Sequence, residues 1–312
     1  MERLTFDEFL DARTEFEADV QATPNISHFC SSPGWIVPAL LEISEFDPAE
    51  TSCLIVRDGN SWLVFAENRP GYWYPFESAW LFQNPLIGPK AVELLAAAKR
   101  EFLGENPQGF VIGGVQNETE FHENLKLLPG AIHFDEFPAT DCMVADLTNG
   151  VDSFLAGRSK KFRRSIRMAR DRCSEVKIEE AALDFERMMA IQKRTRKWQD
   201  GSDIFHHDDC SRFYRRMIAD FGDRLLFRVA KIDGKDAAFL LGSVFGETFR
   251  GLQMSFADEF RPLGIGNFLQ IDTMRHVFEH ERVTSYDLGM FSEYKERWAD
   301  ETKEFLGCFL VL

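Results

Sequence analysis

The pattern of apolar and polar positions in the first half of the chain predicts a mixed α/β region. Apolar residues recur at helical spacing in the segments 3–20, 34–44 and Pro89–Leu103, and we expect each to form a helix. Short apolar runs bounded by turn residues predict buried strands, and the Asp58-Gly59-Asn60 turn joins two of them into a hairpin. The strands expected here are Cys53–Val56, Trp62–Phe65, Phe110–Ile112 and Cys142–Leu147.

The second half shows the same two periods in a different order. Three helices are expected first, at Leu155–Cys173, Phe185–Trp198 and Cys210–Phe221. Three strands joined by tight turns follow, at Leu225–Ile232, Ala237–Phe245 and Phe249–Phe256. The pattern then predicts a helix, a short strand, a helical turn and a terminal strand, at Asn267–His280, Ser285–Leu288, Ser292–Trp298 and Phe305–Leu312.

Charge divides the 312-residue chain at about the same place as the change in pattern. Residues 1–150 carry 8 Lys and Arg against 24 Asp and Glu, whereas residues 151–312 carry 28 against 27. Such different surfaces predict two domains, 1–150 and 151–312. The acidic balance of the first half argues against its binding nucleic acid or an anionic membrane.

The cysteines and the absence of long apolar segments predict a cytoplasmic protein. None of the six cysteines forms a C-x-x-C pair, so we expect reduced thiols. The first residues lack the basic and apolar segments of a signal peptide. No apolar stretch approaches the ~20 residues that span a bilayer, and we expect no membrane span.

One loop carries a candidate phosphate site. Arg261-Pro262-Leu263-Gly264-Ile265-Gly266 follows the strand Phe249–Phe256 and opens a helix at Asn267. Glycines at 264 and 266 would let the backbone approach a ligand closely and turn its N–H groups inward. The helix N-terminus adds partial positive charge, and Arg261 adds a guanidinium. The alternative is an ordinary glycine-containing turn between a strand and a helix.

The order of elements around this loop resembles the GNAT superfamily, whose motif Q/R-x-x-G-x-G/A holds the CoA pyrophosphate. The chain is similar to the CelD/FemAB-like branch in particular, over most of 150–305 and more loosely over 1–150. The segments that carry the resemblance are 159–166 (SKKFRRSI), 226–229 (LFRV), Asp258 with Pro262 and Gly264, 286–289 (YDLG), Tyr294-Lys295 with Trp298, 32–35 (SPGW) and 84–87 (NPLI). The resemblance implies an α/β GNAT fold, with a mixed and mostly antiparallel sheet flanked by helices. It also implies two GNAT-like lobes, of which the first is degenerate.

The resemblance also implies a donor site for acetyl-CoA or another acyl-CoA. Its strand ending at Gln253 to Phe256 would lie beside the pantetheine arm, and an exposed backbone N–H there would polarise the thioester carbonyl. The residues expected to bind the donor are Met254, Ser255, Phe256, Arg261, Leu263, Gly264, Ile265, Gly266 and Asn267. Tyr294 is expected to protonate the departing thiolate, and Lys295 to neutralise developing charge. A packed ring and a solvated ammonium are the alternatives for these two side chains.

Candidates for the general base and the acceptor site are less specific. Asp258 precedes the loop and Asp287 ends the strand Ser285–Leu288, so either could take the amine proton, although both could be turn residues. The resemblance implies that the loop from Trp198 to Asp209 frames the acceptor, with Trp198, His206 and His207 as candidate contacts. The alternative is a helix N-cap at Asp208 or Asp209 beside two exposed histidines.

Two further motifs suggest other chemistry. His276-Val277-Phe278-Glu279-His280 has the H-x-x-E-H pattern of zinc peptidases, but only 32 residues follow it, too few for the helix that would supply a third ligand, so we expect no metal. Arg158–Arg172 holds eight basic residues against one acid. It could bind tRNA or the 3′-phosphate of CoA, although the regular apolar stripe favours the solvated face of an amphipathic helix.

We therefore expect a GNAT-type enzyme that transfers an acyl group, other than an aminoacyl group, from acyl-CoA to a small-molecule or peptide amine by direct attack in a ternary complex. One alternative is a FemAB-like aminoacyltransferase that uses aminoacyl-tRNA as its donor. The acidic first half and the absence of a long helical arm oppose it. The other alternative is a catalytically inactive GNAT fold that acts as a binding module.

Overall fold

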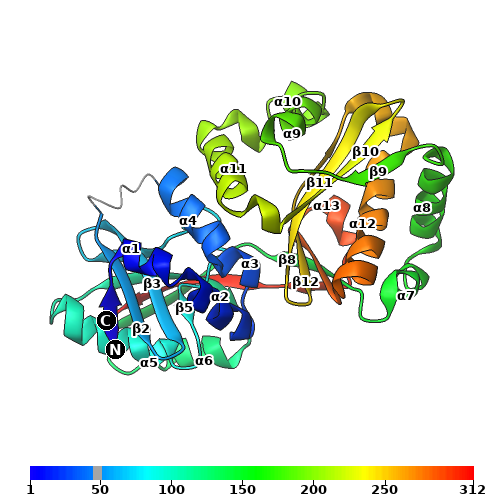
Figure 1. Cartoon of the computed structure of the whole chain (residues 1–312). Helices are drawn as coiled ribbons and strands as arrows, with labels where there is room; N and C mark the ends of the chain where they lie inside the picture. Colours follow the sequence, from blue (N-terminus) through cyan, green and yellow to red (C-terminus); the bar gives the residue numbers. More distant parts are fainter. Residues whose placement is uncertain (45–50) are drawn as a thin grey trace. The chain divides into compact units, whose positions relative to one another are not determined.

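The computed structural model describes residues 1–44 and 51–312, which fold into two compact units (Figure 1). Unit 1 consists of residues 1–141 and 303–312, and unit 2 of residues 142–302. Both contain a mixed, mostly antiparallel sheet flanked by helices, which confirms the expected fold class. The expected boundary at 150/151 differs from these units for two reasons. The strand Cys142–Asp146, expected in the first domain, pairs with Ser285–Met290 of unit 2, and the strand expected to end the second domain pairs with strands of unit 1.

Unit 1 is built on a sheet with the order β1-β2-β3-β4-β6-β15-β7, and β5 pairs with β3. Its strands are β1 (Glu2–Leu4), β2 (Cys53–Asp58), β3 (Ser61–Arg69), β4 (Tyr72–Pro75), β5 (Leu86–Ile87), β6 (Gly109–Gln116), β7 (His133–Pro138) and β15 (Phe305–Val311). Its helices are α1 (Phe6–Asp11), α2 (Arg13–Ala22), α3 (His28–Ser31), α4 (Pro33–Glu42), α5 (Ala91–Ala98), a π-helical turn (Lys99–Leu103) and α6 (Glu120–Lys126). The hairpin expected around Gly59 is confirmed by the antiparallel pairing of β2 with β3.

The C-terminal strand β15 lies inside the sheet of unit 1, between β6 and β7, and pairs antiparallel with both. Cys308 and Leu310 are fully buried in the core that the sheet forms with α5. Because side chains alternate along a strand, these residues face the core on the same side of β15. The last residues of the chain are therefore part of the framework of the first unit.

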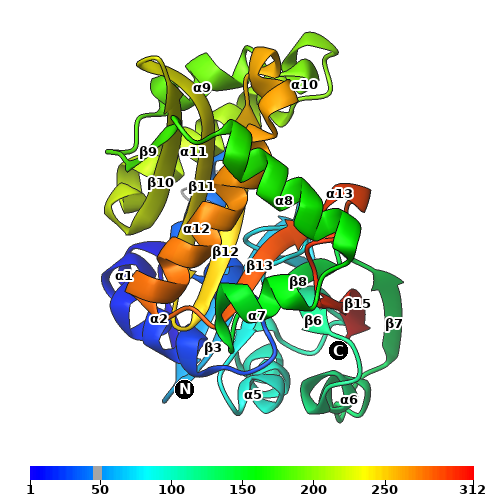
Figure 2. The ribbon, with the colours of Figure 1, turned by 90° about the vertical axis from the view of Figure 1, so that its right-hand side faces the viewer.

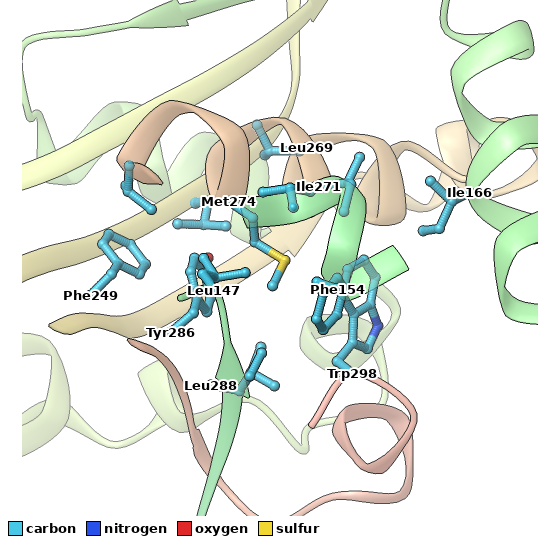
Figure 3. Packing of buried hydrophobic residues seen from close by; sticks show 14 of the residues in the cluster. Leu147, Phe154, Ile166, Phe249, Leu269, Ile271, Met274, Tyr286, Leu288 and Trp298 are labelled. Carbon is cyan, nitrogen blue, oxygen red and sulfur yellow. The ribbon is translucent and has the colours of Figure 1, made fainter. Parts of the chain in front are cut away.

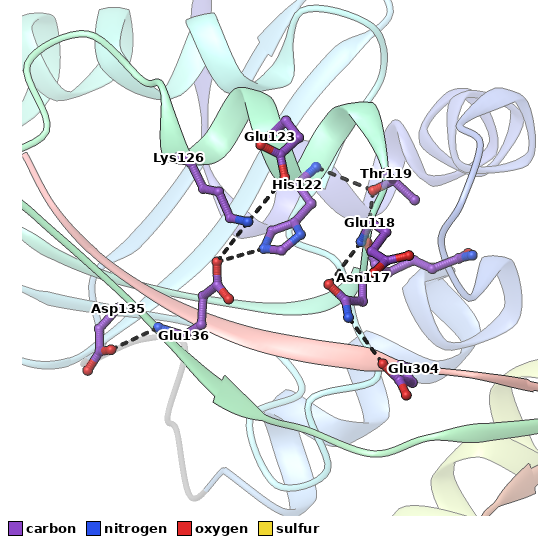
Figure 4. A network of polar contacts seen from close by, with 10 residues as sticks. Asn117, Glu118, Thr119, His122, Glu123, Lys126, Asp135, Glu136 and Glu304 are labelled. Carbon is purple, nitrogen blue, oxygen red and sulfur yellow. Dashed lines mark hydrogen bonds and ion pairs between the residues drawn. The ribbon is translucent and has the colours of Figure 1, made fainter.

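A polar network ties α6 to β7 in unit 1 (Figure 4). His122 is buried, and its Nε2 lies 2.9 Å from Oε1 of Glu136. The ammonium of Lys126 lies 3.1 Å from Glu123 and 3.2 Å from Glu136. Nearby, the amide of Asn117 donates to Glu304, which links the end of β6 to the approach to β15. A buried imidazole needs such partners, since an unpaired one would lose its hydration without compensation.

Unit 2 is built on a sheet with the order β14-β8-β13-β12-β11-β10-β9. Its strands are β8 (Cys142–Asp146), β9 (Lys177–Glu180), β10 (Leu225–Ile232), β11 (Lys235–Phe245), β12 (Thr248–Phe256), β13 (Ser285–Met290) and β14 (Glu301–Lys303). Its helices are α7 (Gly150–Ala156), α8 (Lys160–Arg172), α9 (Phe185–Gln192), α10 (Arg196–Gln199), α11 (Asp208–Phe221), α12 (Ile265–Glu281) and α13 (Glu293–Glu296). Three short 3₁₀ turns cover Ile204–His206, Gly222–Arg224 and Asp258–Leu263.

The sheet of unit 2 is covered on both faces. Helices α8 and α12 lie side by side on one face, and α9 and α11 lie on the other (Figures 1 and 2). Between the sheet and α12 lies an apolar core that includes Phe249, Met274, Tyr286 and Leu288, with Trp298 at its margin beside Phe154 (Figure 3). This core fixes where α12 begins relative to β12 and β13.

The basic segment expected as one helix, Leu155–Cys173, forms two. Helix α7 ends at Ala156 and α8 begins at Lys160. The hydroxyl of Ser159 accepts a hydrogen bond from the N–H of Phe162, which is the side-chain cap of a new helix start. The expected first helix, 3–20, also divides, and Thr5 and Glu8 form a capping box at the start of α1.

Candidate functional site

The centre of the candidate site is the place where two parallel strands separate. Strands β12 and β13 pair over three residues each, from Thr248 opposite Ser285 to Arg250 opposite Asp287. Beyond Arg250 the two strands are not paired, although β12 continues to Phe256 and β13 to Met290. Within the part of the chain that the structure describes, one edge of β12 therefore has no strand partner from Gly251 onward.

A β-bulge lies at this point of separation. On β11, Leu241 is opposite Gln253 and Gly242 is opposite Gly251, so Leu252 is an extra residue in β12. A bulge bends its strand and redirects the groups that follow it. The sequence contains no signal for this bulge beyond Gly251.

The open edge of β12 offers backbone N–H groups. The N–H of Ala257 donates to the carbonyl of Ala237, next to β11. Successive residues of a strand direct their N–H groups to opposite sides, so those of Met254 and Phe256 point toward the open edge. The N–H group of Ser255 points the other way, toward β11. Of the three residues expected beside the donor, two thus present the N–H group that could polarise a carbonyl.

The glycine loop follows β12, as expected, but its structure differs from an open loop. Residues Asp258–Leu263 form a 3₁₀ turn, and Gly264 has φ +73 and precedes the first residue of α12. No side chain of the described residues caps α12. The N–H groups of its first turn have no partner within the helix, which makes the start of α12 a site for an anion.

Each glycine of the loop has a packing reason that the sequence did not reveal. Gly264 needs glycine for its positive φ, and a Cβ there would lie 3.2 Å from that of Ala169 on α8. A Cβ on Gly266 would lie 3.0 Å from the ring of Phe256. Gly266 therefore lets α12 approach β12, whereas the sequence suggested that it lets a ligand approach the backbone.

Arg261 and Asp258 bond to each other. Nε of Arg261 donates to Oδ1 of Asp258 over 2.7 Å, and the guanidinium lies 5.5 Å from the centre of the Phe256 ring. Both side chains are exposed. The carboxylate expected as a base is thus held by the arginine expected to bind phosphate.

Lys295 lies close to the point where the strands separate. Its ammonium donates to the carbonyl of Met290 over 3.0 Å. A Cβ on Gly289 would lie 3.5 Å from Nζ of Lys295 and 3.6 Å from the carbonyl oxygen of Gly251. Burial, with the nearby Arg250 guanidinium second, lowers the pKa of Lys295 to about 8. The ammonium is therefore poised to release a proton near neutral pH.

Asp287 is part of a buried ion pair. Its Oδ2 lies 2.5 Å from Nη1 of Arg250, and its Oδ1 accepts a hydrogen bond from the N–H of Gly289 over 2.7 Å. Nη1 of Arg250 also lies 3.5 Å from the sulfur of Cys142. Both oxygens of Asp287 are thus engaged. Sequence reasoning missed Arg250, although an arginine between Phe249 and Gly251 in an apolar strand was a visible signal.

Tyr294 connects the end of the site to the start of α12. Its hydroxyl donates to Oδ1 of Asn267 over 3.2 Å, and its ring packs beside Trp298. Burial raises the pKa of Tyr294 to about 12. The phenol is therefore a weaker acid than an exposed tyrosine, and its hydrogen bond positions Asn267.

The expected acceptor residues adopt a local arrangement of their own. The rings of Trp198 and His206 are stacked with centroids 4.1 Å apart, and Nε2 of His206 bonds to the carbonyl of Trp198. His207 is the N-cap residue of α11, without a side-chain cap bond, so the cap expected at Asp208 or Asp209 is wrong by one or two residues. Lys197, which precedes Trp198, is near enough to Lys295 to contribute to its lowered pKa.

The face of β12 opposite α12 contains a residue that the sequence did not indicate. Tyr214 of α11 is buried, and its hydroxyl accepts a hydrogen bond from Nε2 of Gln253 over 3.0 Å. Its ring packs against Phe205 with centroids 5.1 Å apart. The loop that begins at Trp198 is thereby connected to β12 next to the bulge.

The H-x-x-E-H motif lies within α12. His276 lies 3.2 Å from Glu180 of β9, and its ring is 4.8 Å from that of His280. Among residues 1–44 and 51–312, no group of three or more histidine, cysteine, aspartate or glutamate side chains is arranged to hold a metal ion. In the same part of the chain, no helix is long and apolar enough to cross a membrane. All six cysteines are free thiols.

Comparison with known proteins identifies the domain that carries this site. Residues 158–298 match the family described as acetyltransferase (GNAT) domain. No curated protein matched the sequence.

The whole chain is similar in fold to several solved structures. A conserved protein of unknown function from Bacteroides thetaiotaomicron shares 13% identity, with 100% of both chains covered and a TM-score of 0.70. FemX shares 16%, with 99% of this chain and 97% of FemX covered and a TM-score of 0.70. L-PGS from Bacillus licheniformis shares 14%, with 94% and 90% covered and a TM-score of 0.56. Residues 158–298 thus match a GNAT acetyltransferase domain, a family of acyltransferases, and the whole chain shares the fold of FemX and of the other two solved structures.

Proposed function

We propose that unit 2 transfers an acyl group from acyl-CoA to the amine of a small molecule or peptide by direct attack. The observation that carries the proposal is the separation of β12 and β13 after Arg250 and Asp287. The uncapped start of α12 follows the open edge of β12, and the ammonium of Lys295 lies at the point of separation. An anion site, an amide-lined edge and a cation thus occur together.

The donor would bind along the open edge of β12. The first-turn N–H groups of α12, at Ile265, Gly266 and Asn267, would hold the pyrophosphate, and the helix dipole would add partial positive charge. The N–H groups of Met254 and Phe256 would bond to the pantetheine arm and the thioester carbonyl. Acyl-CoA itself supplies the activated carbonyl. The protein orients the acyl-CoA and supplies N–H groups and positive charge around its phosphates and thioester carbonyl.

Lys295 is the proposed proton source for the departing thiolate. With a pKa of about 8, its ammonium is close in acidity to a thiol, whose ordinary pKa is ~8.5, so proton transfer costs little. From Tyr294, with a pKa of about 12, the same transfer would be uphill by ~5 kcal/mol. We therefore assign the acid role to Lys295. Tyr294 keeps a positioning role through Asn267.

The two carboxylates have structural roles in this proposal. Asp258 holds Arg261, and Asp287 holds Arg250 and the Gly289 turn. We propose that the acceptor amine enters the site unprotonated. Its attack on the acyl carbon then needs orientation more than a strong base. The loop from Trp198 to His207 remains the proposed acceptor side, because Lys197 lies near Lys295.

Isothermal titration with CoA and acetyl-CoA tests the donor site, and release of CoA in the presence of a panel of amines tests turnover. We expect one site per chain for both ligands. The Lys295→Met variant should bind acetyl-CoA as the wild type does but release CoA at least 100-fold more slowly. Absence of binding by the wild-type protein would overturn the proposal.

One observation supports a second candidate function. Helix α8 is strongly basic, and the proteins of similar fold include FemX and L-PGS. The resemblance to the FemAB-like branch therefore keeps an aminoacyl-tRNA donor open. This donor has no pyrophosphate for the start of α12, which is why we place acyl-CoA first. If the protein retained aminoacyl-tRNA but did not bind acetyl-CoA, aminoacyl-tRNA would replace acyl-CoA as the first proposed donor.

A further inference from the structure

Helix α8 presents an unbalanced row of cations to the solvent. Over its 13 residues it carries seven exposed basic side chains and one acid, Asp171. Two of the seven have structural partners: Arg163 donates to the carbonyls of Ala156 and Arg158, and Arg172 donates to that of Pro262. Within the described residues the other five make no hydrogen bond or ion pair; they are Lys160, Lys161, Arg164, Arg167 and Arg170.

These basic side chains destabilise the helix that carries them. Lys160 and Lys161 stand in the first turn, where the helix dipole favours anions, and no acid is present there. Lys160 and Arg164, like Arg163 and Arg167, are four residues apart, so like charges face each other along the surface. A helix that breaks local rules without an internal compensation is a candidate for an external partner.

The amphipathic helix of similar length on the other face of the sheet shows what a solvated face looks like in this protein. Helix α11 has 14 residues and carries acids and arginines together, DDCSRFYRRMIADF. One of its arginines, Arg215, pairs with Glu186 over 2.6 Å. The whole chain has a net charge of −15. The concentration of one sign on α8 is therefore not a general property of the surface.

The basic row ends at the proposed donor site. Arg172 bonds to Pro262 over 2.9 Å, and the sulfur of Cys173 lies 3.8 Å from the carbonyl oxygen of Leu263. A Cβ on Gly264 would lie 3.2 Å from that of Ala169. Helix α8 thus lies directly against the loop that precedes α12, as the two views of the ribbon also show (Figures 1 and 2).

The length of the row of cations indicates how large an anionic surface its partner must have. Lys160 and Arg170 are ten residues apart, which is about 15 Å along a helix. The 3′-phosphate of a CoA molecule is a single group and would occupy one or two of the five cations. A partner that engages the whole row must present an anionic surface of similar length.

We infer that α8 is the docking surface for an acidic acyl carrier protein, whose phosphopantetheine arm delivers the acyl group. The inference rests on the proposed acyl transfer at β12. The arm presents the same thioester and pantetheine to the open edge as CoA does, and its single phosphodiester would lie at the start of α12, where CoA would place its pyrophosphate. A nucleic acid would match the charge of α8 but brings no pantetheine for β12. In the transfer, the amine nitrogen bonds to the acyl carbon and loses one proton, and the carbon–sulfur bond breaks. The departing sulfur gains a proton, so the carrier leaves as its free thiol and one proton passes overall from the amine to the sulfur.

Binding of two probes to the full-length protein tests the inference. The first is a fluorescein-labelled acidic acyl carrier protein in its phosphopantetheine form, measured by anisotropy; the second is acetyl-CoA, measured by titration calorimetry. In Arg164→Glu/Arg167→Glu we expect carrier binding at least tenfold weaker and acetyl-CoA binding within twofold of wild type. Carrier binding by the wild type should also weaken strongly between 50 and 300 mM salt. Neither arginine side chain has a partner among residues 1–44 and 51–312, so the variant should keep its helical circular dichroism.

The matched control is Arg100→Glu/Lys235→Glu, which changes the net charge equally at two exposed positions outside α8. It should bind the carrier as the wild type does. Equal weakening in both variants would show an effect of net charge and overturn the inference. An equal loss of acetyl-CoA binding in the α8 variant would assign the row to CoA phosphates and overturn it. So would tighter binding of a labelled tRNA than of the carrier. If wild type binds acetyl-CoA but not the carrier, only the inference fails; if it binds neither, the proposed function fails.

Discussion

At the residue scale, the environment of Lys295 leads to a prediction about pH. Burial and the nearby Arg250 disfavour the charged form, so the pKa of Lys295 falls to about 8. Below that pH the ammonium is present and can protonate the thiolate; above it the proton is lost. The rate of acyl transfer at saturating substrate should therefore fall as the pH rises through about 8. Lys295→Arg should slow acyl transfer and abolish the fall near pH 8, because a guanidinium holds its proton too tightly to give it to the thiolate.

Tyr294→Phe is the matched control for that assignment. It removes the hydrogen bond to Asn267 but not the proposed acid. We expect kcat within tenfold of wild type, with the fall near pH 8 unchanged and a KM for acyl-CoA raised a few-fold. Lys295→Met should lose roughly 10²- to 10⁴-fold in kcat, the usual contribution of general acid catalysis. A larger loss of kcat in Tyr294→Phe than in Lys295→Met would return the acid role to the tyrosine.

Much of the candidate site was visible in the sequence as residue types, but the contacts were not. The loop 261–266 and the pair Tyr294-Lys295 were identified, and their roles remain predictions. The bond between Arg261 and Asp258 could not be foreseen, because it depends on the 3₁₀ turn that brings residues three apart together. Arg250 was missed because its partner, Asp287, lies 37 residues away on a neighbouring strand.

At the element scale, the start of α12 depends on how closely it approaches β12. A Cβ on Gly266 would lie 3.0 Å from the ring of Phe256. Gly266→Ala should therefore displace the N-terminal turn, reduce affinity for acetyl-CoA about tenfold, and cost ~1–3 kcal/mol of stability as an overpacked contact does. Calorimetric titration and thermal unfolding measure the two effects.

The double variant Phe256→Leu/Gly266→Ala separates packing from ligand contact. The smaller side chain makes room for the added methyl group, so donor affinity should recover toward that of Phe256→Leu alone. Residues in contact show such non-additive effects, whereas independent ones do not. Additive losses in the double variant would show instead that Gly266 is needed where the ligand touches the backbone.

Element types were predictable from the apolar period, and boundaries less so. The strands β10 to β12 and the helix α12 were foreseen from alternation and from tight turns. The break between α7 and α8 was not, because the apolar stripe of 155–173 continues across it while the chain turns at Gly157 to Ser159. Short edge elements such as β1, β7 and β9 lack an apolar run and gave no signal.

At the scale of the whole molecule, unit 2 is an insertion between two parts of unit 1. The chain leaves unit 1 after Asp141 and returns at Lys303. The sequence predicted the number of units from charge and pattern. The sequence did not predict that the chain returns to unit 1, because an apolar C-terminal strand could join either sheet. Only the pairing of β15 with β6 and β7 shows which sheet it joins.

The return of the chain predicts that its last residues stabilise the first unit. Leu310 is fully buried between β6 and β7 in the core of unit 1. Leu310→Ala should lower the free energy of unfolding of unit 1 by ~2–5 kcal/mol, as leucine-to-alanine cavities do. The half-buried neighbour Val311 faces away from that core, so Val311→Ala should cost clearly less. Urea unfolding followed by tryptophan fluorescence measures both, since four of the six tryptophans, Trp35, Trp62, Trp73 and Trp80, belong to unit 1.

At urea concentrations below the unfolding transition, the affinity of both variants for acetyl-CoA should stay within twofold of wild type. Equal losses of stability in the two variants would contradict the central position of β15, and a parallel loss of acetyl-CoA binding would show that unit 2 needs an intact unit 1 to hold its donor site.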